Sequence, residues 1–184
     1  MKELSLNILD VAKNSVSAGA DTIRIELVTD ENGWLSFSVE DNGCGMSDEV
    51  LKRVTDPFYT TRKTRSVGLG LPFLKLAAEQ TGGRLEITSS TEKGNSGTKL
   101  VATFDTKNID FMPLGDVVST VCILISGSPD IRFVFRDTTP KGTVLIDTSD
   151  LKAVLGDDIS LAEPEIVAWM REYLKEQYEQ RLDK

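Results

Sequence analysis

The chain has 184 residues, of which 21 are basic and 29 acidic, so its formal net charge is −8. This length allows one domain, or one domain with an appendage, and the acidic balance argues against a nucleic-acid surface. No apolar run approaches the ~20 residues of a membrane span, and we expect no signal peptide and a cytoplasmic location. The two cysteines, Cys44 and Cys122, match neither a disulfide framework nor a zinc site.

Residues 1–105 combine helical and strand patterns. Leu6, Leu9 and Ala12 recur at helical spacing, and Gly19 follows as a helix C-cap. Apolar alternation and turn residues further predict a hairpin of strands 23–28 and 35–39, a helix from the glycines at 68–70 to those at 82–83, and two strands at 84–89 and 98–104. This order of elements predicts an α+β two-layer sandwich, a mixed sheet with helices on one face.

Residues 106–184 contain no motif of known chemistry. Their pattern predicts a turn and a helix ending near Gly127, a hairpin of strands 131–135 and 142–146, a short helix capped by Ser149, and a last helix from Pro164 to about Leu182. We expect this α/β extension to pack on the core formed by residues 1–105. The alternative is a docking or dimerisation element, and nine acidic against five basic residues from Asp150 onward favour a basic partner surface.

The first segment with candidate chemistry lies on the first helix. Asp10 and Asn14 are four residues apart, so both side chains leave the same helix face. An amide oxygen at such a place can complete an octahedral Mg²⁺ shell made otherwise of phosphate oxygens and waters. The competing interpretation is an ordinary solvated helix face.

The second segment follows the predicted hairpin. Asp41 stands at a strand end, and Gly43 and Gly45 remove side chains where a flat base can approach the backbone. A carboxylate there can accept a hydrogen bond from the exocyclic amine of adenine, and Met46 can pack against the ring. An Asx turn in an ordinary tight loop explains the same residues equally well when they are taken alone.

The third and fourth segments bracket a short stretch of hydroxylic and basic residues. Glycines directly before a helix let backbone N–H groups and the positive helix end meet a phosphate. A basic loop between two helices is the competing interpretation. The candidate ligand-binding residues of these segments are Phe58, Thr60, Thr61, Arg62, Lys63, Gly68, Leu69, Gly70 and Leu71.

Together the segments at 10–14, 41–45, 56–62 and 68–71 resemble the N, G1, F and G2 boxes of the GHKL ATPase superfamily over about residues 1–105. The resemblance implies the Bergerat fold, ATP as ligand, Asn14 as a Mg²⁺ ligand, and Thr98 reaching adenine through water. It places Asp10 where hydrolysing members carry a glutamate that activates water and where many histidine kinases carry asparagine. Because aspartate is one methylene shorter, its reach to the attacking water stays open.

The chain contains no histidine, which excludes autophosphorylation on histidine within this chain. The expected function is therefore a Mg-ATP-binding regulatory protein that phosphorylates or switches a separate protein partner, as anti-sigma-factor kinases do. One alternative is an ATP-hydrolysing homodimer that resembles mismatch-repair and topoisomerase modules. A non-hydrolysing adenine-nucleotide sensor is another. No nucleic-acid partner is expected.

Overall fold

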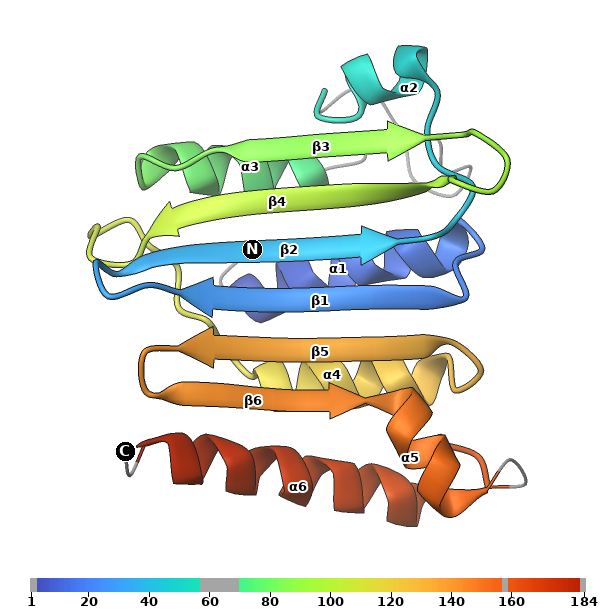
Figure 1. Ribbon diagram of the computed structural model, residues 1–184. Helices are drawn as coiled ribbons and strands as arrows, with labels where there is room; N and C mark the ends of the chain where they lie inside the picture. Colours follow the sequence, from blue (N-terminus) through green and yellow to red (C-terminus); the bar gives the residue numbers. More distant parts are fainter. Residues whose placement is uncertain (1–2, 57–69, 157–158, 183–184) are drawn as a thin grey trace.

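The structure, a computed structural model, describes residues 3–56, 70–156 and 159–182. Its strands are β1 (Thr22–Thr29), β2 (Trp34–Asp41), β3 (Leu85–Ser90), β4 (Gly97–Asp105), β5 (Arg132–Thr139) and β6 (Gly142–Asp147). Its helices are α1 (Leu4–Ser17), α2 (Asp48–Arg53), α3 (Gly70–Gln80), α4 (Val117–Gly127), α5 (Thr148–Leu155) and α6 (Pro164–Leu182). The strands form one mixed sheet, and α1, α3 and α4 lie on the same face of it (Figure 1). The predicted α+β sandwich with helices on one face is confirmed.

Most predicted elements occur within a few residues of their expected bounds, but two details differ. The short helix α5 is capped by Asp147, whose side chain accepts a hydrogen bond from the Ser149 N–H, so the prediction of Ser149 as cap was wrong. The helix α2 was not predicted. Its signals are a Ser47 cap, acidic residues in the first turn and basic residues in the last, which stabilise the two ends of a helix.

One sheet joins the first part of the chain, residues 1–105, to the second part, residues 106–184. The strand order is β3-β4-β2-β1-β5-β6, and β1 pairs antiparallel with β2 but parallel with β5, so Ile23 lies beside Phe133. One hydrophobic core contains Phe37 and Phe104 from the first part and Phe133 and Phe135 from the second, all at most 1% exposed. Full burial of each such side chain contributes about 1.5–3 kcal/mol. The second part therefore extends the same sheet and the same core.

Turn chemistry positions the strand ends. In the β1–β2 hairpin, Gly33 adopts a φ of +88°, and Asp30 closes the turn by accepting from the Trp34 N–H. At the opposite end of this hairpin β2 ends at Asp41, which is paired in register with Thr98 of β4.

Within the described ranges, no helix is long and apolar enough to cross a lipid bilayer.

Candidate nucleotide site

Asp41 ends β2, and two donors from different parts of the chain hold its carboxylate. The hydroxyl of Ser15 on α1 donates to Oδ2 at 2.5 Å, and the backbone N–H of Gly43 donates to Oδ1 at 2.9 Å. Ser15 is 4% exposed, whereas Asp41 stays partly accessible. Each carboxylate oxygen has a further lone pair, so Asp41 can accept another hydrogen bond from a ligand at the strand end.

The loop after β2 is fastened to the turn between α1 and β1. The side-chain oxygen of Asn42 accepts from the backbone N–H groups of Asp21 and Thr22 at 3.1 and 3.0 Å, and its amide nitrogen donates to the Asp21 carboxylate at 2.6 Å. The bonds from Asn42 and Thr22 lower the pKa of Asp21. The Cys44 N–H donates to the Ala18 carbonyl at 2.9 Å. These bonds fix the loop relative to α1.

Gly43 and Gly45 make close contacts inside this loop. Gly45 has a φ of +69°, and a Cβ there would collide with the carbonyl oxygen of Ser90. Gly43 is buried, and a Cβ there would lie 2.9 Å from the carbonyl oxygen of Ala18. Close packing thus requires glycine at both positions, which the sequence pattern alone does not reveal. A larger residue would displace the loop from its contacts with Ser90 and Ala18.

The hydroxyl of Ser89 on β3 connects three parts of the site. It lies 2.8 Å from the carbonyl oxygen of Gly97, 2.8 Å from the Thr98 hydroxyl and 2.8 Å from the Met46 N–H, which donates to it. A hydroxyl has one proton, so if Ser89 donates to Gly97, Thr98 must donate to Ser89. In that arrangement the Thr98 oxygen retains acceptor capacity toward a ligand or water.

Asp10 and Asn14 are half-buried on α1, which crosses behind β1 and β2 (Figure 1). A Cβ at Gly70, the first residue of α3, would collide with Oδ2 of Asp10. The Asp10 carboxylate therefore lies against the N-terminal turn of α3, the end that carries partial positive charge. Both Asp10 and Asn14 take part in further interactions.

These positions follow one another along α1. Ser15 touches Asp41 near one end, Asn14 is its neighbour in the chain, and Asp10 lies one turn away beside Gly70. With a helical rise of 1.5 Å per residue, Asp10 and Ser15 are separated by about 7–8 Å along the axis. The arrangement can receive an elongated ligand with a hydrogen-bonding ring at Asp41 and an anionic tail near α3.

Other predicted site residues fall differently. Leu71 is half-buried and packs against the core. Seven predicted ligand-binding residues lie outside the described residues: Phe58, Thr60, Thr61, Arg62, Lys63, Gly68 and Leu69.

Three residues of the site were missed by sequence reasoning: Ser15, Asn42 and Ser89. Ser15 carried a signal, because the helical period places it on the buried face with Ile8 and Ala12, and a buried hydroxyl requires a partner. Asn42 and Ser89 carried none, because the partners of Asn42 lie 20 and 21 residues away and those of Ser89 lie 8 to 43 residues away.

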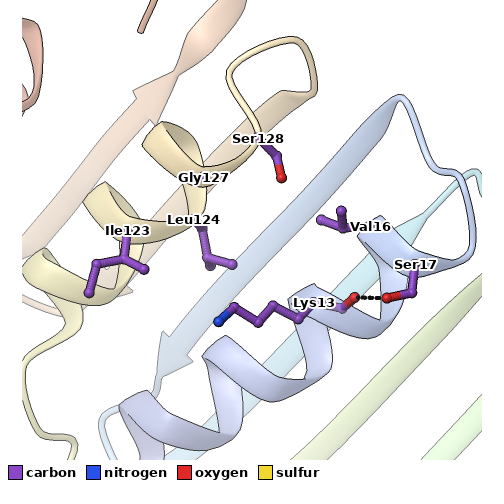
Figure 2. Close-up of a pocket in the computed structure, with 7 residues that line it drawn as sticks. All are labelled: Lys13, Val16, Ser17, Ile123, Leu124, Gly127 and Ser128. Atoms are coloured by element: carbon purple, nitrogen blue, oxygen red, sulfur yellow. Dashed lines mark hydrogen bonds between the residues drawn. The ribbon is translucent and has the colours of Figure 1, made fainter. Parts of the chain in front are cut away.

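A separate hollow of about 300 Å³ lies between α1 and α4 (Figure 2). Val16 and Leu124 line it, Lys13 extends along it, and Ser17 donates to the Lys13 carbonyl at 2.8 Å. Asp10, Asn14, Ser15 and Asp41 are not among the described residues that line this hollow. It is therefore distinct from the site at the strand end.

Comparison with known proteins identifies the family. Residues 1–108 match the model of the histidine kinase-, DNA gyrase B- and HSP90-like ATPases, so the chain belongs to this family. The chain is 30% identical over 119 residues to the adaptive-response sensory kinase SasA of Prochlorococcus marinus (62% of this chain, 31% of that protein). It is 33% identical over 101 residues to the signal transduction histidine-protein kinase AtoS of Escherichia coli (55% and 16%). The chain thus spans less than a third of either relative.

Among solved structures, the ATPase domain of MutL from Aquifex aeolicus, determined with ADP, superposes with a TM-score of 0.52. The alignment covers 100% of this chain and 70% of that one at 13% identity. At this identity the likeness establishes the fold, which is that of the GHKL ATPases. The predicted membership of the GHKL superfamily is confirmed.

Proposed function

We propose that this protein binds Mg·ATP at the end of β2 and uses it to phosphorylate or switch a separate protein. The observation that carries the proposal is the Asp41 carboxylate, held by Ser15 and Gly43 yet still partly accessible. Its remaining lone pairs suit the exocyclic amine of adenine. Guanine presents a carbonyl at that position, and two facing acceptors without a proton cost about 1–3 kcal/mol. Thr98, its partner in the sheet, supplies a second polar contact.

The other end of the site suits the phosphates and the metal. Asn14 offers an amide oxygen one turn from Asp10, and hard oxygen ligands are those that Mg²⁺ prefers. When bound, Mg²⁺ would neutralise phosphate charge and leave the terminal phosphoryl group open to attack. The N-terminal turn of α3 at Gly70 supplies backbone N–H groups for the phosphates. The residues present therefore fit the metal–nucleotide complex.

Transfer to a separate protein is favoured by the sensory-kinase relatives and by the absence of histidine from this chain. Hydrolysis is the second candidate, and the Asp10 carboxylate beside α3 favours it. A general base must lie within hydrogen-bond reach of the attacking water, and Asp10 stands at the end of the site where the phosphates would bind.

The free exposed thiol of Cys44 suits a reducing compartment, and we place the protein in the cytoplasm.

The proposal is tested by calorimetry of ATP binding with and without Mg²⁺. Asn14→Ala should remove the Mg²⁺-dependent part of the affinity, whereas the matched variant Asn32→Ala, in the distant β1–β2 turn, should bind as wild type does. Equal Mg·ATP affinity in Asn14→Ala would remove this residue from the site. Incubation with γ-labelled ATP and cell extract then separates transfer to a protein, release of phosphate, and binding without turnover.

Cysteine labelling gives an independent test. Cys44 is exposed in the loop beside Gly45, whereas Cys122 on α4 is 1% exposed and burial raises the pKa of its thiol. A small alkylating reagent should therefore modify Cys44 first, because the thiolate is the reactive form. Saturating Mg·ATP should protect Cys44, as mass spectrometry of the two peptides would reveal. An unchanged Cys44 rate would mean that nucleotide does not cover this loop.

A further inference from the structure

The helix α6 covers the outer edge of the sheet at β6 (Figure 1). The side chain of Gln177 bonds both backbone groups of Leu145, accepting from its N–H at 2.9 Å and donating to its carbonyl at 3.0 Å. Nearer the C-terminus, Tyr178 and Arg181 bond the buried carboxylate of Asp137. Met170 and Leu174 complete this packed face and are fully buried. One face of α6 is thus fixed against β5 and β6.

A pair of aromatic residues lies away from this packed face. Trp169 is 49% exposed and Tyr173 is 37% exposed, although both are large. Their rings stack on each other with centroids 5.1 Å apart and planes 11° apart. Since Met170, Leu174 and Gln177 already fix the helix, so much aromatic surface in water is not needed for its packing. Exposed Trp and Tyr residues are enriched among the energetic centres of protein interfaces.

Three acidic residues of α6 lie near this pair. Glu165, Glu172 and Glu176 are exposed and lie three or four positions from Trp169 or Tyr173, so they are neighbours on the helix surface. Along the described part of α6, Lys175 is the one basic residue classed as exposed, and its ammonium lies 2.9 Å from the Glu172 carboxylate. The surface formed by Trp169, Tyr173 and these three glutamates is here called the aromatic stripe.

We propose that the aromatic stripe is a docking surface for a basic amphipathic segment of another protein. Apolar side chains of that segment would cover the two rings. Its Lys and Arg side chains would pair with the glutamates or lie over the ring faces as cation–π contacts. A second copy of this chain does not fit, because two such stripes placed together would bring Glu165 and Glu176 of one copy against carboxylates of the other.

The stripe is remote from the nucleotide site in the fold. It lies beyond β6, whereas Asp41 and Thr98 lie on β2 and β4, three and four strands away (Figure 1). Docking here would therefore leave the strand end accessible to nucleotide. The proposal is independent of the proposed ATP chemistry, and either can fail without the other.

The test uses a synthetic peptide of leucine and lysine, about 18 residues long and patterned as an amphipathic helix, beside a leucine–glutamate peptide of the same pattern. Trp34→Phe leaves Trp169 as the sole tryptophan of the chain, so its fluorescence reports on the stripe. The lysine peptide should shift Trp169 emission to shorter wavelength, and the glutamate peptide should not. Unchanged Trp169 emission on binding, or equal binding of the two peptides, would overturn the proposal.

Two triple variants separate local from general attraction. Glu165→Gln/Glu172→Gln/Glu176→Gln should weaken binding of the lysine peptide at least about 10-fold. The matched control Glu31→Gln/Glu86→Gln/Glu92→Gln also removes three negative charges, from exposed positions elsewhere on the protein. Its affinity for the lysine peptide should stay within about 2-fold of wild type. Equal weakening by both triples would show that net charge alone attracts the peptide, which contradicts the docking surface.

A final pair of measurements tests the rings and the occupant. Trp169→Ala/Tyr173→Ala should weaken binding of a fluorescently labelled lysine peptide at least about 10-fold, with the thermal unfolding midpoint used to confirm that the variant is folded. Unchanged affinity would remove the rings from the surface. Sedimentation of the unlabelled protein should show no self-association that depends on Trp169, and the opposite result would make a second copy the occupant.

Discussion

Two aspartates, Asp41 and Asp137, show how the two parts of this molecule use the same chemical group. Asp41 at the end of β2 accepts from a hydroxyl and a backbone N–H and stays partly accessible. Asp137 in β5 is 3% exposed, and Tyr178 and the guanidinium of Arg181 cover it. Neutral donors on one side leave a carboxylate able to bind a ligand. At Asp137 a cation and an aromatic residue cover the same group, so it serves as a buried structural contact.

Removing Asp137 should have the largest effect on stability. Asp137→Ala would leave the Arg181 charge and the Tyr178 hydroxyl without their partner, a loss of about 3–5 kcal/mol of unfolding free energy. Tyr178→Phe keeps the ion pair and should lose about 1 kcal/mol. Urea denaturation measures both. Equal and small losses would mean that the cluster around Asp137 is not what attaches α6.

Changing Asp41 should affect binding and leave stability nearly unchanged. Asp41→Asn can turn its NH₂ group toward the adenine amine, so ATP affinity should fall about 100-fold. The control Asp105→Asn makes the same change at the other end of the neighbouring strand β4 and should not alter affinity. Calorimetry with ATP and GTP would check the assignment, which fails if the Asp41 variant binds ATP as wild type does.

Ser15 should act through Asp41. Ser15→Ala removes the hydroxyl that orients the carboxylate, and ATP affinity should fall about 10-fold while preference for ATP over GTP also declines. Ser5→Ala removes an equally buried hydroxyl near the other end of α1, where Ser5 bonds Glu3 instead, and should leave both quantities unchanged. If the two variants behave alike, the bond from Ser15 to Asp41 has no part in recognition.

The smallest expected effect concerns pH. The bond from Arg132 lowers the pKa of Asp147 from 3.8 to about 2. Because the pKa is lower in the folded state, the stabilisation is complete above about pH 4 and is lost as the pH falls toward 2. Asp147→Asn should therefore be less stable than wild type by about 1 kcal/mol at pH 7, with the difference shrinking below pH 4. The exposed Asp130→Asn serves as control in denaturation at both pH values, and a constant difference would contradict the assignment.

The sequence predicted the local elements well, because their signals are local. Alternation in 23–28 and 35–39 reflects the two faces of a strand, and Gly33 permits the left-handed turn between them. The helix α2 was missed because its six residues are too short for an apolar period, so only its cap and charges were visible. Of the candidate site, Asp41, Asn14 and Asp10 were chosen from motifs, whereas the residues that hold Asp41 and its loop were not.

What the sequence determined by itself is most of the helices and strands, the family and the polar residues available for chemistry, since these depend on period, turn residues and motif spacing. Only the tertiary structure decided that β5 lies parallel to β1, that Ser15 meets Asp41 and that Asp10 lies beside Gly70. It also decided that Gln177 completes the edge at Leu145. These contacts join residues distant in the chain, and they form because one shared core and one continuous sheet must bury their apolar faces together.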